Sequence, residues 1–435
     1  MCITHASLGR YLVPLCFALS LIGAESGRCG ELQAGAAKVD ITPPLGFPMW
    51  GYGARHDAPC VGVLDPLQAR ALVLSAGNNR IAIVSLDLGR APTRQSTAAI
   101  RQRVKSEANI EHVFLVGSHS HHGPVIELDN WPHRDHSYVR QLERKLGDVI
   151  VKAAKELKPA KIGALSKQLP FNRNRHSKRA DKPVDPEFLV LRVEDMTGKP
   201  IAHAVNFAAH PTMIKAEDMR FSADYPGALA EVVEKVTGAP CLFLQGAAGD
   251  LSANPMAEGG FQKFGELLGR EALALSQSIR CAALDKPSLQ TAEEDFRFRS
   301  RVDLGNPLIK TGFTRAFFRD LVDFYEREYQ DGIRPHLSVA LLDDQIAFVG
   351  VSGEFFCSHS LNLKRRARLP YVFFLGYCND YQQYFPTIEA AAEGGYGASA
   401  GVSTAEVGAG ELIMDHALLH LYRMQGKLAD LKASR

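Results

Sequence analysis

Short apolar runs recur along the chain, and most have the length of a β-strand. Strand-like runs lie at residues 69–74, 81–86, 112–116, 188–193, 201–207, 241–244, 337–342 and 345–351. Stretches with helical character lie at residues 94–107, 138–157, 228–236, 261–282 and 411–430. Strands and helices alternate irregularly, two pairs of runs predict hairpins, and no internal repeat is visible. This order predicts an α/β fold with mixed β-sheets flanked by helices and an active site at the carboxyl ends of strands.

The N-terminus has a different pattern, in which an apolar run at residues 11–22 follows Arg10 and precedes Gly23 and Ala24. This arrangement is typical of a signal peptide, and the run is too short to span a bilayer as a helix. We therefore predict a signal peptide at residues 1–24, a mature domain at residues 25–435, and a secreted or periplasmic protein.

Composition narrows the classes of function. The chain has 435 residues, of which 46% are hydrophobic and 23% charged, and its formal net charge is +2. These values are ordinary for a globular protein, and without a basic block we expect no nucleic-acid partner. Six cysteines would remain after cleavage near Ala24, and an exported protein could pair some of them, but their spacing does not select a pairing.

The most informative polar feature follows the strand-like run at residues 112–116. His119 and His121 come directly after it, and Gly123-Pro124 then turns the chain away. Residues two apart on a strand point to the same face, so two imidazoles can lie side by side at the strand end. Neutral imidazole is the commonest metal ligand among side chains. The alternative is a pair of solvated histidines in a loop.

Other predicted strands end in similar chemistry. Residues 201–207 lead to His210, and residues 345–351 lead to Glu354. Histidine and glutamate are common ligands of catalytic zinc, which keeps a position for water. Each residue also has a structural alternative, because His210 could bond to the backbone and Glu354 could cap a helix. A third strand end, at residues 249–252, could be only a turn with an N-cap.

Taken together, these motifs resemble the neutral (non-lysosomal) ceramidases, specifically their zinc-dependent catalytic domain. The resemblance spans most of the mature chain from about Ala34, so that residues 25–435 are expected to form one zinc hydrolase domain of this type. The motifs that carry it are Val39-Asp40-Ile41-Thr42-Pro43, residues 118–124, Asn206 to Pro211, residues 249–254, Gly353-Glu354-Phe355, Asn379 to Thr387 and Tyr396.

The resemblance implies a set of functional residues. The implied ligands of a single Zn²⁺ per chain are His119, His210, Glu354 and Tyr384. His121 and Tyr396 would line the reacting centre. Ser252 would contact the hydroxyl end of the substrate and is also a candidate nucleophile, and Arg173 matches an active-site arginine.

The resemblance also implies a reaction. We expect an exported zinc-dependent amidohydrolase of lipid metabolism that cleaves the N-acyl amide of ceramide, a sphingolipid, or of a related N-acyl lipid. Zinc lowers the pKa of bound water to about 7, so that zinc-activated water can attack the amide carbonyl. In this hypothesis Tyr396 or His121 helps to stabilise the oxyanion, and His121 transfers a proton to the leaving amine. The partners are then a small lipid-like amide and, transiently, a membrane surface.

Several positions depart from the family pattern. His122 replaces a small residue after the histidine pair, Pro386 interrupts a pair of threonines, and Gly397 stands where the family has glutamate. The motifs are also more closely spaced, and we expect the C-terminal β-sandwich domain of the family to be absent. Two alternatives therefore remain, a zinc hydrolase of the same family acting on a different amide or ester, and a non-catalytic exported protein that binds a metal or another ligand.

One motif points to a serine hydrolase instead. Residues 397–401 fit the pattern G-x-S-x-G around Ser399. A nucleophile elbow of this type needs a strand before the serine and a helix after it. The residues before Ser399 are small and rich in glycine, and they do not predict a strand. We therefore favour zinc chemistry, with Ser252 as the better serine candidate.

Overall fold

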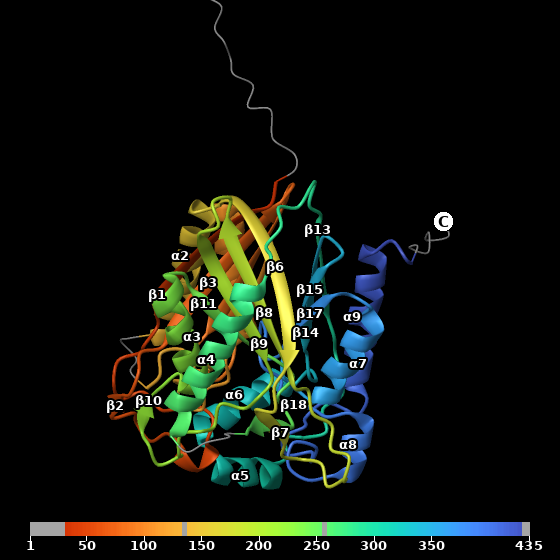
Figure 1. The fold of residues 1–435 in the computed structure, drawn as a ribbon. Coiled ribbons are helices and arrows are strands. Elements are labelled where there is room, and N and C mark those ends of the chain that lie inside the picture. The colour runs from red at the N-terminus through yellow and green to blue at the C-terminus, as the bar shows by residue number, and fades with distance from the viewer. Residues whose placement is uncertain (1–30, 133–136, 255–258, 429–435) are drawn as a thin grey trace, which may run out of the picture.

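The computed structural model describes residues 31–132, 137–254 and 259–428 (Figure 1). Two β-sheets pack face to face, and helices cover the outer face of each. The predicted α/β class with mixed sheets is therefore confirmed. The predicted signal peptide at residues 1–24 lies outside the described residues.

The fold is built from three units with the same order of elements. In each unit three strands form an antiparallel meander, a helix follows, a fourth strand pairs in parallel with the third, and a second helix closes the unit. The first unit contains β1 (Gln33–Asp40), β3 (Gln68–Ala76), β4 (Asn79–Leu86), α1 (Arg94–Ala108), β5 (His112–Gly117) and α2 (Tyr138–Lys155).

The second and third units repeat this order with different sequences. The second contains β6 (Lys158–Gln168), β8 (Glu187–Asp195), β9 (Pro200–Phe207), α3 (Asp224–Thr237), β11 (Cys241–Gln245) and α4 (Gly260–Ser278). The third contains β13 (Leu289–Asp295), β14 (His336–Leu342), β15 (Ile346–Val351), α7 (Cys357–Ala367), β17 (Tyr371–Leu375) and α9 (Ala409–Met424). The repeat lies in topology alone, which explains why no repeat is visible in the sequence.

The first two units share one eight-stranded sheet, whereas the third forms a four-stranded sheet. The shared sheet is held together by only two residue pairs between β1 and β6, Gln33 with Pro159 and Ala34 with Lys158. Both strands begin at this junction and then separate. Beyond the junction the two halves face each other, because β11 of the second unit contacts β3, β4 and β5 of the first.

The layers follow from the alternation of side chains along the strands. On β3, Leu72 and Leu74 belong to a central apolar cluster shared with strands of the second and third units, whereas Ala71 and Val73 face the helices of the first unit. Both faces of the sheet are thus covered, as the continuous apolar runs of the sequence require. Separate apolar clusters lie under α1 and α2, under α3 and α4, and under α7 and α9.

Smaller elements lie at the end of the molecule to which the carboxyl ends of the third and fourth strands of each unit point. They are η1 (Gly53–Arg55), the pair β2 (Gly62–Val63) and β10 (Arg220–Phe221), the pair β7 (Asn172–Asn174) and β12 (Leu251–Ala253), the pair β16 (Glu354–Phe355) and β18 (Tyr384–Phe385), and the helices α5 (Pro307–Ala316), α6 (Arg319–Tyr329) and α8 (Ile388–Glu393). Figure 1 shows β7, β10, β18 and α5 together at the lower end of the molecule.

The described residues contain neither a disulfide nor a membrane-spanning helix. The cysteines of the described residues (Cys60, Cys241, Cys281, Cys357 and Cys378) are all unpaired, so no disulfide forms among them. No helix in the described parts of the chain combines the length and hydrophobicity that crossing a bilayer requires.

A buried asparagine connects the first unit to the third. Asn379 Oδ1 accepts a hydrogen bond from the backbone N–H of Leu115 at 2.9 Å. Its Nδ2 donates to the carbonyl of Val113 at 2.7 Å and to Ser338 Oγ at 3.0 Å. One side chain therefore satisfies polar groups of both sheets in the layer between them.

Replacing this asparagine should destabilise the fold. Asn379→Ala leaves a buried N–H and a buried carbonyl on β5 without partners, which costs roughly 2–4 kcal/mol of unfolding free energy. Denaturant unfolding measures the change, and Asn362→Ala on the exposed face of α7 is the control. Equal stability of the two variants would show that Asn379 does not link the sheets.

Candidate metal centre

Four residues that were predicted as metal ligands leave the ends of strands from all three units. His119 follows β5 by two residues, and His210 follows β9 by three. Glu354 opens β16 and Tyr384 opens β18, and the pairing of these two short strands sets the residues directly opposite each other. All four side chains are buried.

The ligand atoms of three of them converge on one point. His119 Nε2 and His210 Nε2 lie 3.0 Å apart. Glu354 Oε2 lies 3.4 Å from the first nitrogen and 3.1 Å from the second. An ion held tetrahedrally at about 2.0–2.1 Å from each ligand keeps neighbouring ligand atoms about 3.3 Å apart. The three distances therefore match the donor spacing of a zinc-sized ion.

Backbone carbonyls fix which nitrogen of each imidazole faces this point. His119 Nδ1 lies 2.8 Å from the carbonyl oxygen of Gly89, and His210 Nδ1 lies 2.6 Å from that of Ala248. A carbonyl only accepts hydrogen bonds, so each Nδ1 carries the proton and each neutral ring turns its Nε2 lone pair inward. Burial lowers the pKa of His210 to about 3, which keeps that ring neutral.

Three acceptors thus face one another inside the protein. Two nitrogen lone pairs and a carboxylate oxygen repel unless a positive charge lies among them, so the donor set fits a metal cation. Tyrosines complete the surroundings of Glu354, because Tyr381 Oη donates to its Oε1 at 2.5 Å and Tyr377 Oη lies 3.5 Å from its Oε2. The ring of Tyr377 also stacks on His119 at 4.1 Å. The role of Tyr377 was not predicted from the sequence.

An arginine lies beside the cluster, but it is not the predicted one. Arg175 Nη2 donates to His210 Nε2 at 2.8 Å and to Tyr384 Oη at 3.2 Å. Arg173 is exposed on β7, and its Nε reaches only Ser252 Oγ at 3.4 Å. Both arginines are exposed overall, and the guanidinium that reaches the cluster is that of Arg175 and not that of Arg173. The two arginines sit in successive Asn-Arg pairs, and only the bend after β7 shows which one turns inward.

Tyr384 is the fourth predicted ligand. Burial raises the pKa of its phenol well above the usual value, and the neighbouring Glu354 adds to the shift. The phenol therefore keeps its proton until a cation beside it favours the phenolate. Its ring lies 5.7 Å from that of Tyr396, which stays 69% exposed at the mouth of the site.

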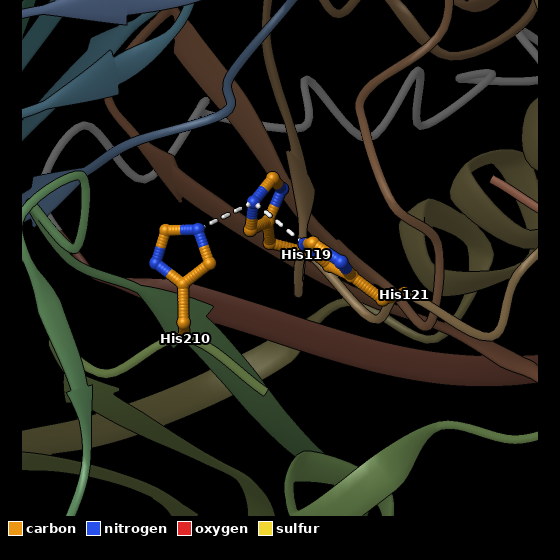
Figure 2. Close-up of side chains that lie close together, drawn as sticks. All are labelled: His119, His121 and His210. Carbon is orange, nitrogen blue, oxygen red and sulfur yellow. Dashed lines mark hydrogen bonds between the residues drawn. The ribbon is translucent and has the colours of Figure 1, made fainter. Parts of the chain in front are cut away.

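His121 also lies at the cluster (Figure 2). Its Nε2 is 3.4 Å from His119 Nε2, and suitable ligand atoms of His119, His121 and His210 all lie within 4.8 Å of one another. The His121 ring is held edge-on between Trp50 and Tyr52. Burial lowers its pKa well below the usual value. His121 is thus a neutral imidazole close enough to act on anything bound at the cluster.

His122, the unusual third histidine, is turned away from the cluster. Its Nε2 lies 2.7 Å from Arg55 Nη2 and 3.2 Å from the carbonyl of Lys215. Burial, together with the charge of Arg55, lowers the pKa of His122 to about 4. His122 therefore packs behind the site and is not among the residues that line the cavity.

The two candidate serines lie outside the cluster of ligand atoms. Ser252 forms a backbone bridge with His210, and the hydroxyl contact that its side chain makes is with Arg173. Ser399 lies in a turn that follows helix α8, so the strand required by a nucleophile elbow is missing before it. The geometry favours metal chemistry over a serine nucleophile.

A cavity of about 100 Å³ opens on the cluster. His121, Glu354 and Tyr384 are among the polar residues that line it. The rest is mostly apolar and comes largely from the segment around Trp50 and from α5 and α6, including Val125, Phe313, Phe317, Phe318, Leu321, Val322 and Tyr325. A hydrocarbon chain attached to a polar group at the cluster would be surrounded by apolar side chains.

Comparisons with known proteins agree with this geometry. Residues 32–258 match the family model described as neutral/alkaline non-lysosomal ceramidase, N-terminal. Neutral ceramidase B of Dictyostelium discoideum is 28% identical over 284 residues, which are 53% of this chain and 36% of that protein. The chain therefore matches just over a third of the length of this curated relative.

Solved structures show the same fold. The crystal structure of neutral ceramidase from Pseudomonas aeruginosa superposes with a TM-score of 0.74 at 19% identity, over 93% of this chain and 76% of that chain. A ceramidase complexed with C2 superposes with a TM-score of 0.76 at 18% identity, over 93% of this chain and 77% of that chain.

The two neighbouring histidines should respond differently to substitution. His119→Ala removes a central ligand and should lower metal affinity at least about tenfold, since even outer-shell changes often cost that much. His121→Ala should retain the metal, because the other donors remain. Elemental analysis of the purified variants measures metal per chain, with surface His416→Ala on α9 as the control. Metal loss in His121→Ala equal to that in His119→Ala would place His121 among the ligands.

Proposed function

The chain belongs to the neutral/alkaline non-lysosomal ceramidase family, and we propose that it is a zinc-dependent amidohydrolase that cleaves the N-acyl amide of ceramide or a related N-acyl lipid. The observation that carries the proposal is the buried convergence of His119, His210 and Glu354 beside a mostly apolar cavity, which Glu354 lines. The proposed metal site for hydrolysis thus lies next to a cavity that can hold a hydrocarbon chain.

The donor set indicates which residues would hold the metal. His119, His210, Glu354 and Tyr384 offer two nitrogens and two oxygens, a combination that suits zinc. When bound in such a site, zinc activates water and polarises the carbonyl group that is attacked. Proton transfer and stabilisation of the carbonyl oxygen are carried out by side chains of the protein.

His121 is proposed to move the proton. Its imidazole is neutral because burial lowers its pKa, so it can accept a proton and then deliver it to the departing amine nitrogen. Trp50 and Tyr52 hold the ring on two sides and thereby fix its direction. The backbone carbonyl of His121 is also bound by Arg55 Nη1 at 2.6 Å, which anchors this part of the loop.

Arg175 and Tyr396 are proposed to stabilise negative charge on the carbonyl oxygen. The guanidinium of Arg175 lies at the cluster and offers several N–H donors. Tyr396 stands next to Tyr384 at the cavity mouth, where its hydroxyl can reach a bound amide. Donors that are already in place before the reaction lower its barrier most effectively. Ser252 would then face the hydroxyl end of the substrate.

The setting of the enzyme is proposed from the sequence. The N-terminal pattern at residues 1–24 supports export, and the apolar cavity supports a lipid amide whose uptake involves transient contact with a membrane surface. A second candidate, a zinc hydrolase of the same family acting on another amide or ester, is favoured by Gly397, which replaces an expected glutamate beside Tyr396 at the cavity mouth.

Substrate and metal dependence can be tested together. Fluorogenic ceramides should be hydrolysed by the purified protein, and a zinc chelator should abolish this activity because the attacking water is no longer activated. Added zinc should restore it. A panel that includes short soluble amides and esters separates the candidates. Hydrolysis that survives complete chelation would contradict zinc chemistry, and activity confined to non-lipid compounds would favour the second candidate.

Alanine variants of the two neighbouring arginines, Arg173 and Arg175, can be compared directly. Arg175→Ala should lower kcat by about 100-fold, as expected for loss of a preorganised donor to the carbonyl oxygen. Arg173→Ala should change kcat by no more than a few-fold, because the guanidinium of Arg173 reaches Ser252 Oγ and not the cluster. Steady-state kinetics with a fluorogenic amide measures both. A larger defect in Arg173→Ala would return the catalytic assignment to Arg173.

A further inference from the structure

Helix α5 (Pro307–Ala316) exposes apolar side chains at the surface. None of its ten residues is buried. Leu308 is 84% exposed and Ile309 is 38% exposed. Adjacent exposed aliphatic residues on a surface helix usually mark a place where another apolar phase or molecule is met.

The exposed residues continue directly into the lining of the cavity. Phe313, one turn further along α5, and Phe317, just after its end, both line the cavity that opens on the metal cluster. The end of the helix lies close against η1, because a Cβ added to Gly53 would come within 2.5 Å of the carbonyl oxygen of Ala316. Figure 1 shows α5 at the lower tip of the molecule. An apolar route therefore runs from the outermost surface to the reacting centre.

Ion pairs hold the helix in this outward position. Lys310 Nζ lies 2.6 Å from Asp323 Oδ1 and 2.6 Å from Glu326 Oε2, and both acids belong to α6. The charged face of α5 is thus directed toward α6, while Leu308 and Ile309 are left on the outside. Two exposed arginines, Arg315 and Arg319, lie at the end of the helix and just beyond it.

We propose that Leu308 and Ile309 insert into a lipid surface, so that α5 seats the cavity mouth on the layer from which the substrate is taken. This proposal rests on the function proposed above, because a lipid amide resides in such a layer. A bilayer surface fits both parts of the helix, since aliphatic side chains enter the acyl boundary while arginines meet headgroup phosphates. The occupant is a lipid surface and not a protein because the apolar route leads into the cavity itself.

A vesicle flotation assay tests the contact without requiring hydrolysis. The full-length protein should float with phosphatidylcholine vesicles, and Leu308→Glu should lower the ratio of bound to free protein about tenfold, the change expected when one leucine no longer enters the apolar phase. Met196→Glu is the control. Met196 is 54% exposed in the β8–β9 turn, at the opposite end of β9 from His210, and the control should float like the parent protein.

Kinetics provides the second readout. Leu308→Glu should lower the rate on amide embedded in vesicles and leave the rate on a short, soluble amide unchanged. Equal flotation of Leu308→Glu and the parent protein, or no flotation of the parent, would overturn the proposal. Concentration-dependent self-association that Leu308→Glu abolishes would also overturn it, because α5 would then contact a second copy of the chain. A protein that floats as expected and hydrolyses no amide would contradict the proposed function and leave the lipid contact supported.

Discussion

The structure is organised around three hydrogen-bond acceptors that are forced together in the interior. The Nε2 atoms of His119 and His210 face each other at 3.0 Å, and Glu354 Oε2 lies within 3.4 Å of both. The carbonyl groups of Gly89 and Ala248 hold the protons of the two rings on the opposite nitrogens. Acceptors that converge in this way favour a cation at their centre, so the arrangement suits a metal ion.

The three-unit topology explains how distant parts of the chain reach this point. Each unit presents the ends of its third and fourth strands to the same region, and the ligands come from these ends. His119 follows the fourth strand of the first unit, and His210 follows the third strand of the second. Glu354 and Tyr384 follow the third and fourth strands of the last unit. The halves of the large sheet share only two residue pairs between β1 and β6, and they face each other, because β11 contacts β3, β4 and β5.

Much of this could be predicted from the sequence, because strand ends carry local signals. Apolar runs followed by His119, His210 and Glu354 located the cluster. The features that could not be predicted from the sequence depend on three-dimensional packing. Two identical Asn-Arg pairs could not be told apart until the bend after β7 turned Arg175 inward. The repeat of three units was invisible, because topology and not residue identity is repeated. The short helix α5, which buries none of its residues, was not identified from the sequence.

The central claim is that one zinc ion lies among these ligands, and anomalous diffraction at the zinc absorption edge tests it most directly. Crystals of the protein purified without chelator should show one strong peak per chain, about 2.0–2.2 Å from His119 Nε2, His210 Nε2 and Glu354 Oε2, with Tyr384 Oη as the fourth protein ligand. A zinc-loaded crystal with no peak at this position, or with zinc bound by other side chains, would contradict the account.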